Sequence, residues 1–229
     1  MKPSVLITGA SKGIGLAVAR TFYAQNYEVI ICARGAEGLA AAKQEMPDLH
    51  TYSCDLADKS AVLSMMADIE KRFPRLDVLV NNGGRFLPGG IHDSETDVFE
   101  QIMDTNLRSA YYVTTAALPA MIAAQKGDIF NICSVASIKA YAGGGLYGIS
   151  KFALLGFSQN LREEMKPHGI RVVGILPGAV KTASWDGVDL PEERFIPAED
   201  IASIIWNTHS LSDRTVVEDL VVRPSLGDI

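Results

Sequence analysis

The sequence predicts a doubly wound α/β fold, a three-layer sandwich in which a seven-stranded parallel sheet lies between two layers of helices. Short runs of valine, isoleucine and leucine alternate along the chain with longer segments of helical periodicity. Most of these runs are continuously apolar, as strands buried on both faces of a parallel sheet are. No repeat, linker or low-complexity stretch divides the chain, so we expect one domain over residues 1–229.

Strands and helices are expected in strict alternation. The apolar runs predict strands at Ser4–Thr8, Glu28–Cys32, Leu49–Tyr52, Asp77–Asn81, Asp128–Ile132, Arg171–Leu176 and Val216–Val222. The segments between them predict helices at Ile14–Gln25, Ala36–Met46, Lys59–Phe73, Thr96–Asn106, Ser109–Gln125, Leu146–Met165 and Ala198–Asn207. Pro119 interrupts the fifth helix pattern and is a candidate site for a kink.

The composition excludes several classes of protein. Hydrophobic residues make up 48% and charged residues 21%, which is not the composition of a disordered chain. The net charge of −6 argues against a nucleic-acid partner, and no stretch suits a membrane span. The three cysteines, Cys32, Cys54 and Cys133, lie in apolar segments and fit buried thiols in a reducing compartment. We therefore expect a cytoplasmic protein without a metal site.

The first predicted strand ends in a glycine-rich turn, Thr8-Gly9-Ala10-Ser11-Lys12-Gly13-Ile14-Gly15, which opens the first helix. Its three glycines allow a tight turn, close approach of the backbone to a phosphate, and close packing of the helix on the strand. The free N–H groups at the helix N-terminus then face the anion. The turn favours a dinucleotide site over an ordinary glycine turn, because it joins a strand to a helix.

The second strand indicates which dinucleotide binds. NAD-binding proteins of this architecture place a carboxylate near its end, on the ribose 2′-hydroxyl. Here Arg34 follows the strand, and no carboxylate comes before Glu37. Arg34 and Lys12 together suit a 2′-phosphate, which favours NADP(H), although either alone could be a solvated surface cation. Asp55 is placed to bond the adenine amino group, or else to cap a helix.

Tyr147 and Lys151 are four residues apart in a predicted helix, so both side chains point into one site. A cation beside the hydroxyl stabilises the phenolate. A drop of about three pH units from the usual pKa would require about 4 kcal/mol, from the lysine and an oxidised nicotinamide. Alone, the pair would fit an amphipathic surface helix. Ser134 ends the fifth strand, at the edge of the sheet where such proteins bind ligands, with Ser137 as second choice.

Together these motifs resemble the short-chain dehydrogenase/reductase family, with its Rossmann-type fold, over essentially the whole chain. The resemblance is carried by Thr8 to Gly15, Asn81-Asn82-Gly83-Gly84, Asn106, Ser134, Tyr147 with Lys151, and Pro177-Gly178. It departs at Gly83, where the family usually has alanine. In the family, helices matching Ser109–Ala124 and Phe152–Met165 form a dimer interface that is often doubled into a tetramer. The resemblance therefore implies a homodimer or homotetramer.

The resemblance also implies a reaction, in which a hydride passes from NADPH to a carbonyl carbon. Ser134 and Tyr147 are expected to polarise the carbonyl oxygen, and Tyr147 to donate the proton. Lys151 is expected to tune Tyr147 and bind the nicotinamide ribose, while Asn106 holds a water of the proton relay. Cofactor contacts are implied for Gly9, Ser11, Lys12, Gly13, Ile14, Gly15, Arg34, Asp55, Leu56, Asn82, Gly83, Tyr147, Lys151, Pro177, Gly178, Val180 and Thr182.

Residues 183–197 are expected to form a short substrate lid. Within it, Trp185 could stack on a planar ring while Asp186 or Asp189 pairs with an amidine-like edge such as a pterin's; alternatively, Trp185 only covers the cofactor. The stretches Pro177 to Trp185 and Arg214 to Ile229 resemble bacterial sepiapterin reductase-like members, which favours a small carbonyl compound as substrate. Two alternatives stay open: a 3-oxoacyl-[acyl-carrier-protein] reductase, which the acidic lid disfavours, and an NADP(H)-sensing regulator without turnover.

Overall fold

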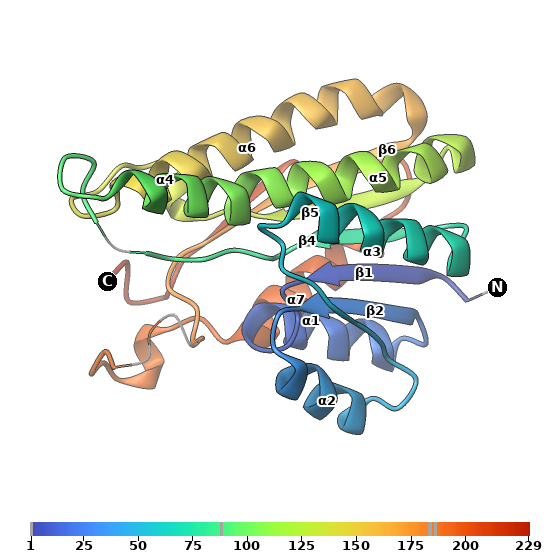
Figure 1. Cartoon of the computed structure of the whole chain (residues 1–229), viewed down its shortest axis with the longest axis horizontal. Helices are drawn as coiled ribbons and strands as arrows, with labels where there is room; N and C mark the ends of the chain where they lie inside the picture. The colour runs from blue at the N-terminus through green and yellow to red at the C-terminus, as the bar shows by residue number, and fades with distance from the viewer. Residues whose placement is uncertain (1, 88, 183–184, 186) are drawn as a thin grey trace.

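The computed structural model describes residues 2–87, 89–182, 185 and 187–229. All strand pairs of its seven-stranded sheet are parallel, in the order β3-β2-β1-β4-β5-β6-β7, which confirms the predicted fold class (Figure 1). The strands are β1 (Ser4–Thr8), β2 (Glu28–Ala33), β3 (His50–Ser53), β4 (Val78–Asn81), β5 (Gly127–Ile132), β6 (Ile170–Pro177) and β7 (Asp219–Val222).

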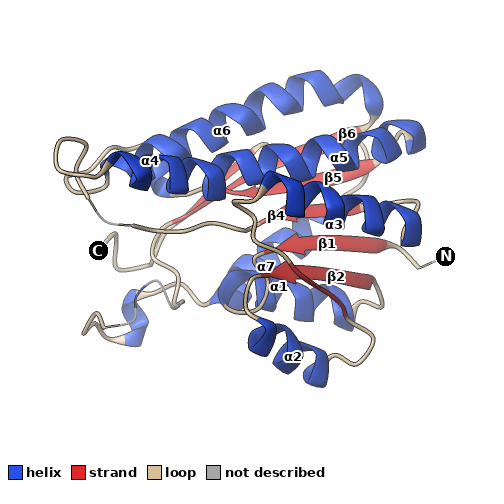
Figure 2. Ribbon diagram, viewed as in Figure 1, coloured by secondary structure: helices blue, strands red, loops and turns tan. Residues whose placement is uncertain are grey.

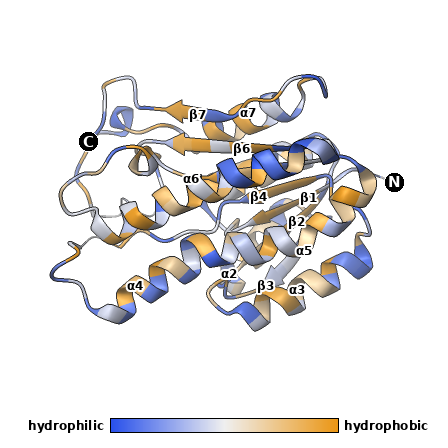
Figure 3. Cartoon of the chain, turned by 90° about the horizontal axis from the view of Figure 1, so that it is seen from above, coloured by the Kyte–Doolittle hydropathy of each residue, from blue (hydrophilic) through white to orange (hydrophobic). Residues whose placement is uncertain are grey.

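Helices cover both faces of the sheet. They are α1 (Gly13–Ala24), α2 (Ala36–Glu45), α3 (Lys59–Arg72), α4 (Thr96–Met103), α5 (Ser109–Ala124), α6 (Gly145–Met165) and α7 (Ala198–His209). Figure 2 shows α1, α2 and α7 on one face and α3, α5 and α6 on the other, and each group closes its own apolar core against the strands. The inner strands β1 and β4 are mainly hydrophobic along their length (Figure 3). Because all strand pairs are parallel, the carboxyl ends of the strands lie at one edge of the sheet.

Most boundaries differ from the sequence-based expectation by one or two residues, and those of β7 and α4 differ by three. Leu49 closes a turn after α2, with its N–H bonded to the carbonyl of Met46, so β3 begins one residue later. The carbonyl of Glu218 accepts from the N–H of Gly174 at 2.8 Å, but β7 itself begins at Asp219, opposite Gly174, three residues later than expected. Helix α4 ends at Met103 and continues as a π-helical turn, Asp104–Arg108, directly into α5. Helix α5 runs through Pro119 as one element. No helix in the described part of the chain combines the length and apolar character needed to cross a membrane.

A buried ion network holds the amino-terminal edge of the sheet. Arg171 donates from Nε and an Nη to the two carboxylate oxygens of Asp128, both at 2.6 Å, and His209 Nδ1 lies 2.5 Å from the same carboxylate. The ring of His209 is fixed by Tyr27, whose hydroxyl lies 2.7 Å from Nε2. Burial alone would raise the pKa of Asp128, but the hydrogen bonds from His209 and Arg171 hold it below its usual range. The network therefore joins β5, β6, α7 and the turn between α1 and β2.

Candidate active site

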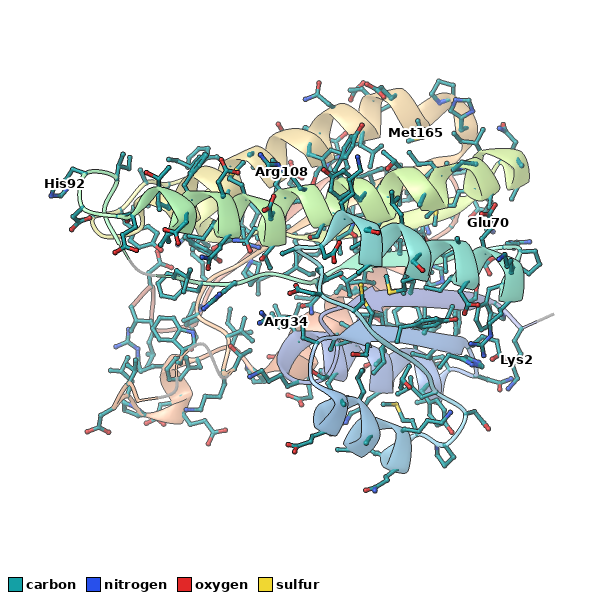
Figure 4. All side chains as sticks on the ribbon, in the orientation of Figure 1. Lys2, Arg34, Glu70, His92, Arg108 and Met165 are labelled. Atoms are coloured by element: carbon teal, nitrogen blue, oxygen red, sulfur yellow. The ribbon has the colours of Figure 1, made fainter. Side chains whose placement is uncertain are left out.

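Loops that are far apart in the sequence meet at the carboxyl edge of the sheet, toward which the arrows of Figure 1 point. They follow β1, β4, β5 and β6, so the parallel topology itself gathers the motifs singled out above. Arg34 lies just beyond the end of β2, whereas Lys2 marks the amino-terminal edge (Figure 4).

The glycine-rich turn can only be built from glycine at several positions. Gly9 and Gly13 have φ angles of +64° and +57°. A side-chain carbon on Gly9 would lie 2.8 Å from Gly83 Cα, and one on Gly13 would lie 3.0 Å from Thr182 Cγ2. The first turn of α1 contains no acidic residue, and its N-cap side chain forms no hydrogen bond to the backbone. This cradle fits a pyrophosphate at a helix N-terminus.

Asn82 braces this turn. Its Nδ2 donates to the carbonyl oxygens of Thr8 at 2.9 Å and Gly9 at 3.0 Å. The amide nitrogen of Asn82 therefore stabilises the turn. The hydroxyl of Thr8 in turn accepts from the N–H groups of Asn82 and Gly83, at 3.1 and 2.9 Å. Sequence reasoning gave no role to Thr8, although a hydroxyl on the last residue of β1 is the available signal.

The residues expected around the adenosine lie beside α2 and β3. A carbon on Gly38 would lie 2.9 Å from Ser11 Cβ, so the glycine-rich turn touches the first turns of α2, and Arg34 and Lys12 are both exposed there. Asp55 accepts from the N–H of Ala57 at 3.1 Å, whereas the N-cap of α3 is Asp58. The helix-cap alternative for Asp55 is therefore wrong.

Leu56 explains the departure at Gly83. A carbon on Gly83 would lie 2.2 Å from Leu56 Cδ1, so the buried leucine occupies the space that an alanine methyl group would need. Leu56 therefore fills the space left by the missing methyl group, so the packing at this position is kept.

Ser134, Tyr147 and Lys151 come together at the carboxyl end of β5. Tyr147 and Lys151 lie one turn apart on α6, with Lys151 Nζ 5.8 Å from the centroid of the tyrosine ring. Lys151 is buried, and its Nζ donates to the carbonyl oxygen of Ile132 at 2.8 Å. The side chain of Ser134 lies close enough to Tyr147 to oppose the rise in the pKa of that hydroxyl. Ser137, the second choice, is used within the chain, because its Oγ accepts from the N–H of Ser134 at 3.2 Å.

Burial dominates the protonation of this pair. It raises the pKa of Tyr147, and neighbouring Ser134 opposes the shift only in part. It also lowers the pKa of Lys151 to about 8. In the protein alone, burial therefore outweighs any lowering of the tyrosine pKa by Lys151, since the ammonium is itself desolvated and is bonded to a carbonyl oxygen. The expected drop required the oxidised nicotinamide as well as the lysine. The cationic ring of an oxidised nicotinamide would act in the opposite direction to burial.

Asn106 is fully buried on the π-helical turn, a type of distortion that is frequent at functional sites. Its side chain bonds both backbone groups of Arg85, at 2.7 and 3.0 Å, and Nδ2 also donates to Ser150 Oγ at 2.9 Å. Ser150, which sequence reasoning missed, donates to the carbonyl oxygen of Tyr147 at 2.8 Å. A carbon on Gly84 would lie 3.5 Å from Asn106 Oδ1 and 3.6 Å from Lys151 Nζ, so these two side chains border one small space.

The segment after β6 returns to the sheet and forms the outer part of the site. The N–H of Gly178, next to Pro177, donates to the carbonyl of Val222 at 2.7 Å, and buried Val180 forms a bridge to Ile196. The Trp185 ring packs edge-on against Phe195, with centroids 5.3 Å apart. Asp189 is exposed, and Asp186 lies outside the described residues.

Phe86 is an aromatic neighbour of Tyr147 that sequence reasoning did not identify. Its ring meets the Tyr147 ring edge-on, with centroids 5.1 Å apart and an interplanar angle of 85°. Phe86 is 40% exposed, so the contact leaves an aromatic surface open beside the tyrosine. The sequence carries no periodic signal for it, because it lies in the loop after β4.

Comparisons with known proteins agree with this geometry. A family model described as short chain dehydrogenase matches residues 3–192. The sepiapterin reductase of Chlorobaculum tepidum is 33% identical, over 100% of this chain and 99% of the relative. The NADP-dependent 3-hydroxy acid dehydrogenase YdfG of Escherichia coli K12 is 32% identical, over 96% and 94%. Among solved structures, an actinorhodin polyketide ketoreductase crystallised with NADPH superposes with a TM-score of 0.90 at 26% identity, covering 100% of this chain and 98% of that one. This chain is therefore a member of the short chain dehydrogenase family, an oxidoreductase.

Proposed function

We propose that the chain is an NADPH-dependent carbonyl reductase resembling sepiapterin reductase, with Tyr147 as the proton donor. The observation that carries this proposal is the grouping of a tyrosine, a buried lysine and a neighbouring serine at one point of the carboxyl edge. An NADP(H)-sensing regulator without turnover would not need a phenol, a buried cation and a serine hydroxyl in such close contact.

The cofactor is NADP(H). The glycine-rich turn suits the pyrophosphate, since added side-chain carbons on Gly9 and Gly13 would fill the cradle. Arg34 and Lys12 suit a 2′-phosphate, because they flank the contact between this turn and α2. Further contacts are proposed for Ser11, Ile14, Gly15, Asp55, Leu56, Asn82, Gly83, Lys151, Pro177, Gly178, Val180 and Thr182. NADPH, when bound, supplies the hydride that the side chains of this chain cannot supply.

The residues of the chain handle the substrate oxygen and its proton. Ser134 Oγ and Tyr147 Oη hold the carbonyl oxygen, and the Tyr147 hydroxyl, whose pKa is raised by burial, keeps its proton until negative charge develops on that oxygen. Lys151 Nζ then stabilises the tyrosine oxygen. The space bordered by Asn106 and Lys151 is suited to a water molecule through which Tyr147 regains its proton.

The proposed substrate is a small carbonyl compound with a planar ring. The aromatic surface of Phe86 beside Tyr147 and the ring of Trp185 on the lid support this choice. Asp189 and Asp186 remain candidates for the polar edge of such a ring. The relationship to the C. tepidum sepiapterin reductase, over nearly the full length of both chains, points in the same direction.

The first test is the loss of NADPH absorbance with purified protein, comparing sepiapterin with an acetoacetyl thioester. Faster turnover of sepiapterin supports the proposal. Faster turnover of the thioester favours the 3-oxoacyl-carrier reductase alternative and reduces Trp185 to a lid residue. NADPH binding without turnover of any carbonyl compound would leave the sensing role.

We further propose one NADP(H)-binding domain over residues 1–229, with a lid at residues 183–197, in a cytoplasmic homodimer or homotetramer. Apolar side chains on α5 and α6 are exposed enough for such an assembly, notably Tyr111, Ile149 and Phe152, at 49%, 39% and 47%. Met121, Leu154 and Leu155 on the same helices are buried in the core instead. A monomeric mass by light scattering at micromolar concentration would exclude the assembly.

A further inference from the structure

Three successive glycines, Gly143 to Gly145, lead into the helix that carries Tyr147. At Gly144 the backbone does not require glycine, because φ is −97°. The requirement comes from a side chain: a carbon on Gly144 would lie 2.2 to 2.5 Å from three ring carbons of Tyr141. The Tyr141 ring therefore lies directly on the backbone at the start of α6.

Ile91 is seated in the same way on the next residue. A carbon on Gly145 would lie 2.8 Å from Ile91 Cγ1 and 3.1 Å from its backbone nitrogen. The two loops that supply these side chains are joined by a hydrogen bond from the N–H of Gly89 to the carbonyl of Gly143, at 3.1 Å. Two glycines thus hold two large side chains against the first turn of the helix that bears Tyr147.

The seated side chains remain open to solvent. Tyr141 is 48% exposed and Ile91 is 69% exposed. Burial raises the pKa of Tyr141, and Tyr147 lies close enough to Tyr141 to add to this shift. Ligand sites are typically lined by large hydrophobic side chains that are held in place and remain exposed. Tyr141 and Ile91 have both properties at the start of the helix that carries Tyr147.

We propose that Tyr141 and Ile91, seated on Gly144 and Gly145, form a wall of the substrate site that selects carbonyl groups attached to a flat, uncharged ring over acyclic 3-oxo acids. This proposal rests on the proposed carbonyl reductase function. The Tyr141 ring can stack on a planar ring of the substrate, and this contact costs little conformational entropy because the Tyr141 side chain is already held in place. A carboxylate placed there would lose hydration without a partner, because Tyr141, Ile91 and neighbouring Phe86 carry no charge.

The test compares three carbonyl substrates at saturating NADPH: sepiapterin, butane-2,3-dione and acetoacetate. Tyr141→Ala removes the ring, and Gly144→Ala displaces it while leaving Tyr141 in the sequence. In both variants kcat/KM for sepiapterin should fall about tenfold, the effect of losing one aromatic contact, chiefly through KM. The value for butane-2,3-dione should change by less than about twofold, as should the Kd of NADPH.

Two control variants separate the ring from other effects. Tyr141→Phe keeps the ring and should retain kcat/KM for sepiapterin within about twofold. Gly156→Ala adds the same methyl group on the same helix, where no described atom outside the neighbouring helix backbone lies within 4 Å of the new carbon, and should leave kcat/KM for sepiapterin unchanged. A wild-type preference for acetoacetate over sepiapterin would overturn the proposal. So would an equal loss for sepiapterin and butane-2,3-dione, or a Phe variant as impaired as the Ala variant.

Failure of the wall is distinguishable from failure of the proposed function. If the wild-type protein oxidises NADPH with none of the three compounds, the reductase function is wrong. The affinity of the NADPH complex for sepiapterin, measured by calorimetry, then still tests the wall. Tyr141→Ala should weaken this binding about tenfold, and Tyr141→Phe should leave it unchanged. Unchanged binding in Tyr141→Ala would refute the wall.

Discussion

Replacing Gly15 by alanine would place a methyl group in the tightest contact of the glycine-rich turn. The new carbon would lie 2.5 Å from Asn82 Nδ2, 2.7 Å from Ala10 Cα and 2.9 Å from the carbonyl oxygen of Gly9. Two of these are backbone atoms. The third is held in place, because Asn82 Nδ2 donates to two carbonyl oxygens of the turn. The clash is therefore not relieved by rotating one flexible side chain.

The magnitude follows from opposing effects. Overpacking of this kind costs about 1 to 3 kcal/mol, and weakening the two Asn82 hydrogen bonds costs about 1 kcal/mol each. Alanine in place of glycine inside a helix contributes about 1 kcal/mol in the other direction. We expect a net destabilisation of about 2 to 4 kcal/mol. Because we propose the same turn as the site of the cofactor phosphates, the Kd of NADPH should also rise at least tenfold, by about 1.4 kcal/mol or more.

The assay is urea unfolding together with titration of NADPH fluorescence. Gly156→Ala serves as the matched control, since it lies inside α6 and no described atom outside the neighbouring helix backbone lies within 4 Å of its new carbon. That variant should be more stable by roughly 0.5 to 1 kcal/mol, with an unchanged Kd for NADPH. A Gly15→Ala protein that matches the control in stability and cofactor affinity would refute the packing argument.

Three further predictions concern charged groups. Asp128→Asn should destabilise the fold by about 3 kcal/mol at neutral pH, because it leaves Arg171 and His209 without their carboxylate. Because the pKa of Asp128 is held low, the stabilisation by this carboxylate should be present above about pH 4 and lost on acidification. An unchanged urea midpoint in the variant at neutral pH would exclude this role. Arg34→Ala should raise KM about tenfold or more for NADPH but not for NADH, and equal changes for the two would rule out a 2′-phosphate contact. Because burial lowers the pKa of Lys151 to about 8, the rate of carbonyl reduction should fall as pH rises through that value. Lys151→Arg should remove this fall, because arginine stays protonated. A wild-type pH–rate profile that is flat from about pH 6 to 10 would contradict the role of the ammonium.

The sequence was sufficient for the sheet and for the motif positions. Apolar runs marked the buried strands, because a parallel sheet covered on both faces leaves no polar alternation. The boundaries failed where tertiary contacts decide them. Leu49 is apolar but closes a turn, and Val216 extends an apolar pattern before any partner strand is present.

Within the site, the sequence located residues whose role is local and missed those whose role arises from the fold. Helical spacing places Tyr147 and Lys151 on one face, and the accompanying motifs mark that face as a site. Phe86 and Tyr141 reach the same place from two different loops, and no periodicity connects them. The pKa of Tyr147 could not be inferred either, since burial outweighs the neighbouring groups and burial is a property of the folded chain.

The central claim is that the Tyr147 hydroxyl donates the proton to the substrate oxygen. The most direct measurement is single-turnover reduction of sepiapterin by the NADPH complex of Tyr147→Phe, beside wild type, with the Kd of NADPH measured for both. Removing one positioned general acid should slow the step by about 10² to 10⁴, while the Kd of NADPH stays within about twofold. A Tyr147→Phe protein that binds NADPH normally and reduces the carbonyl at the wild-type rate would contradict the mechanism.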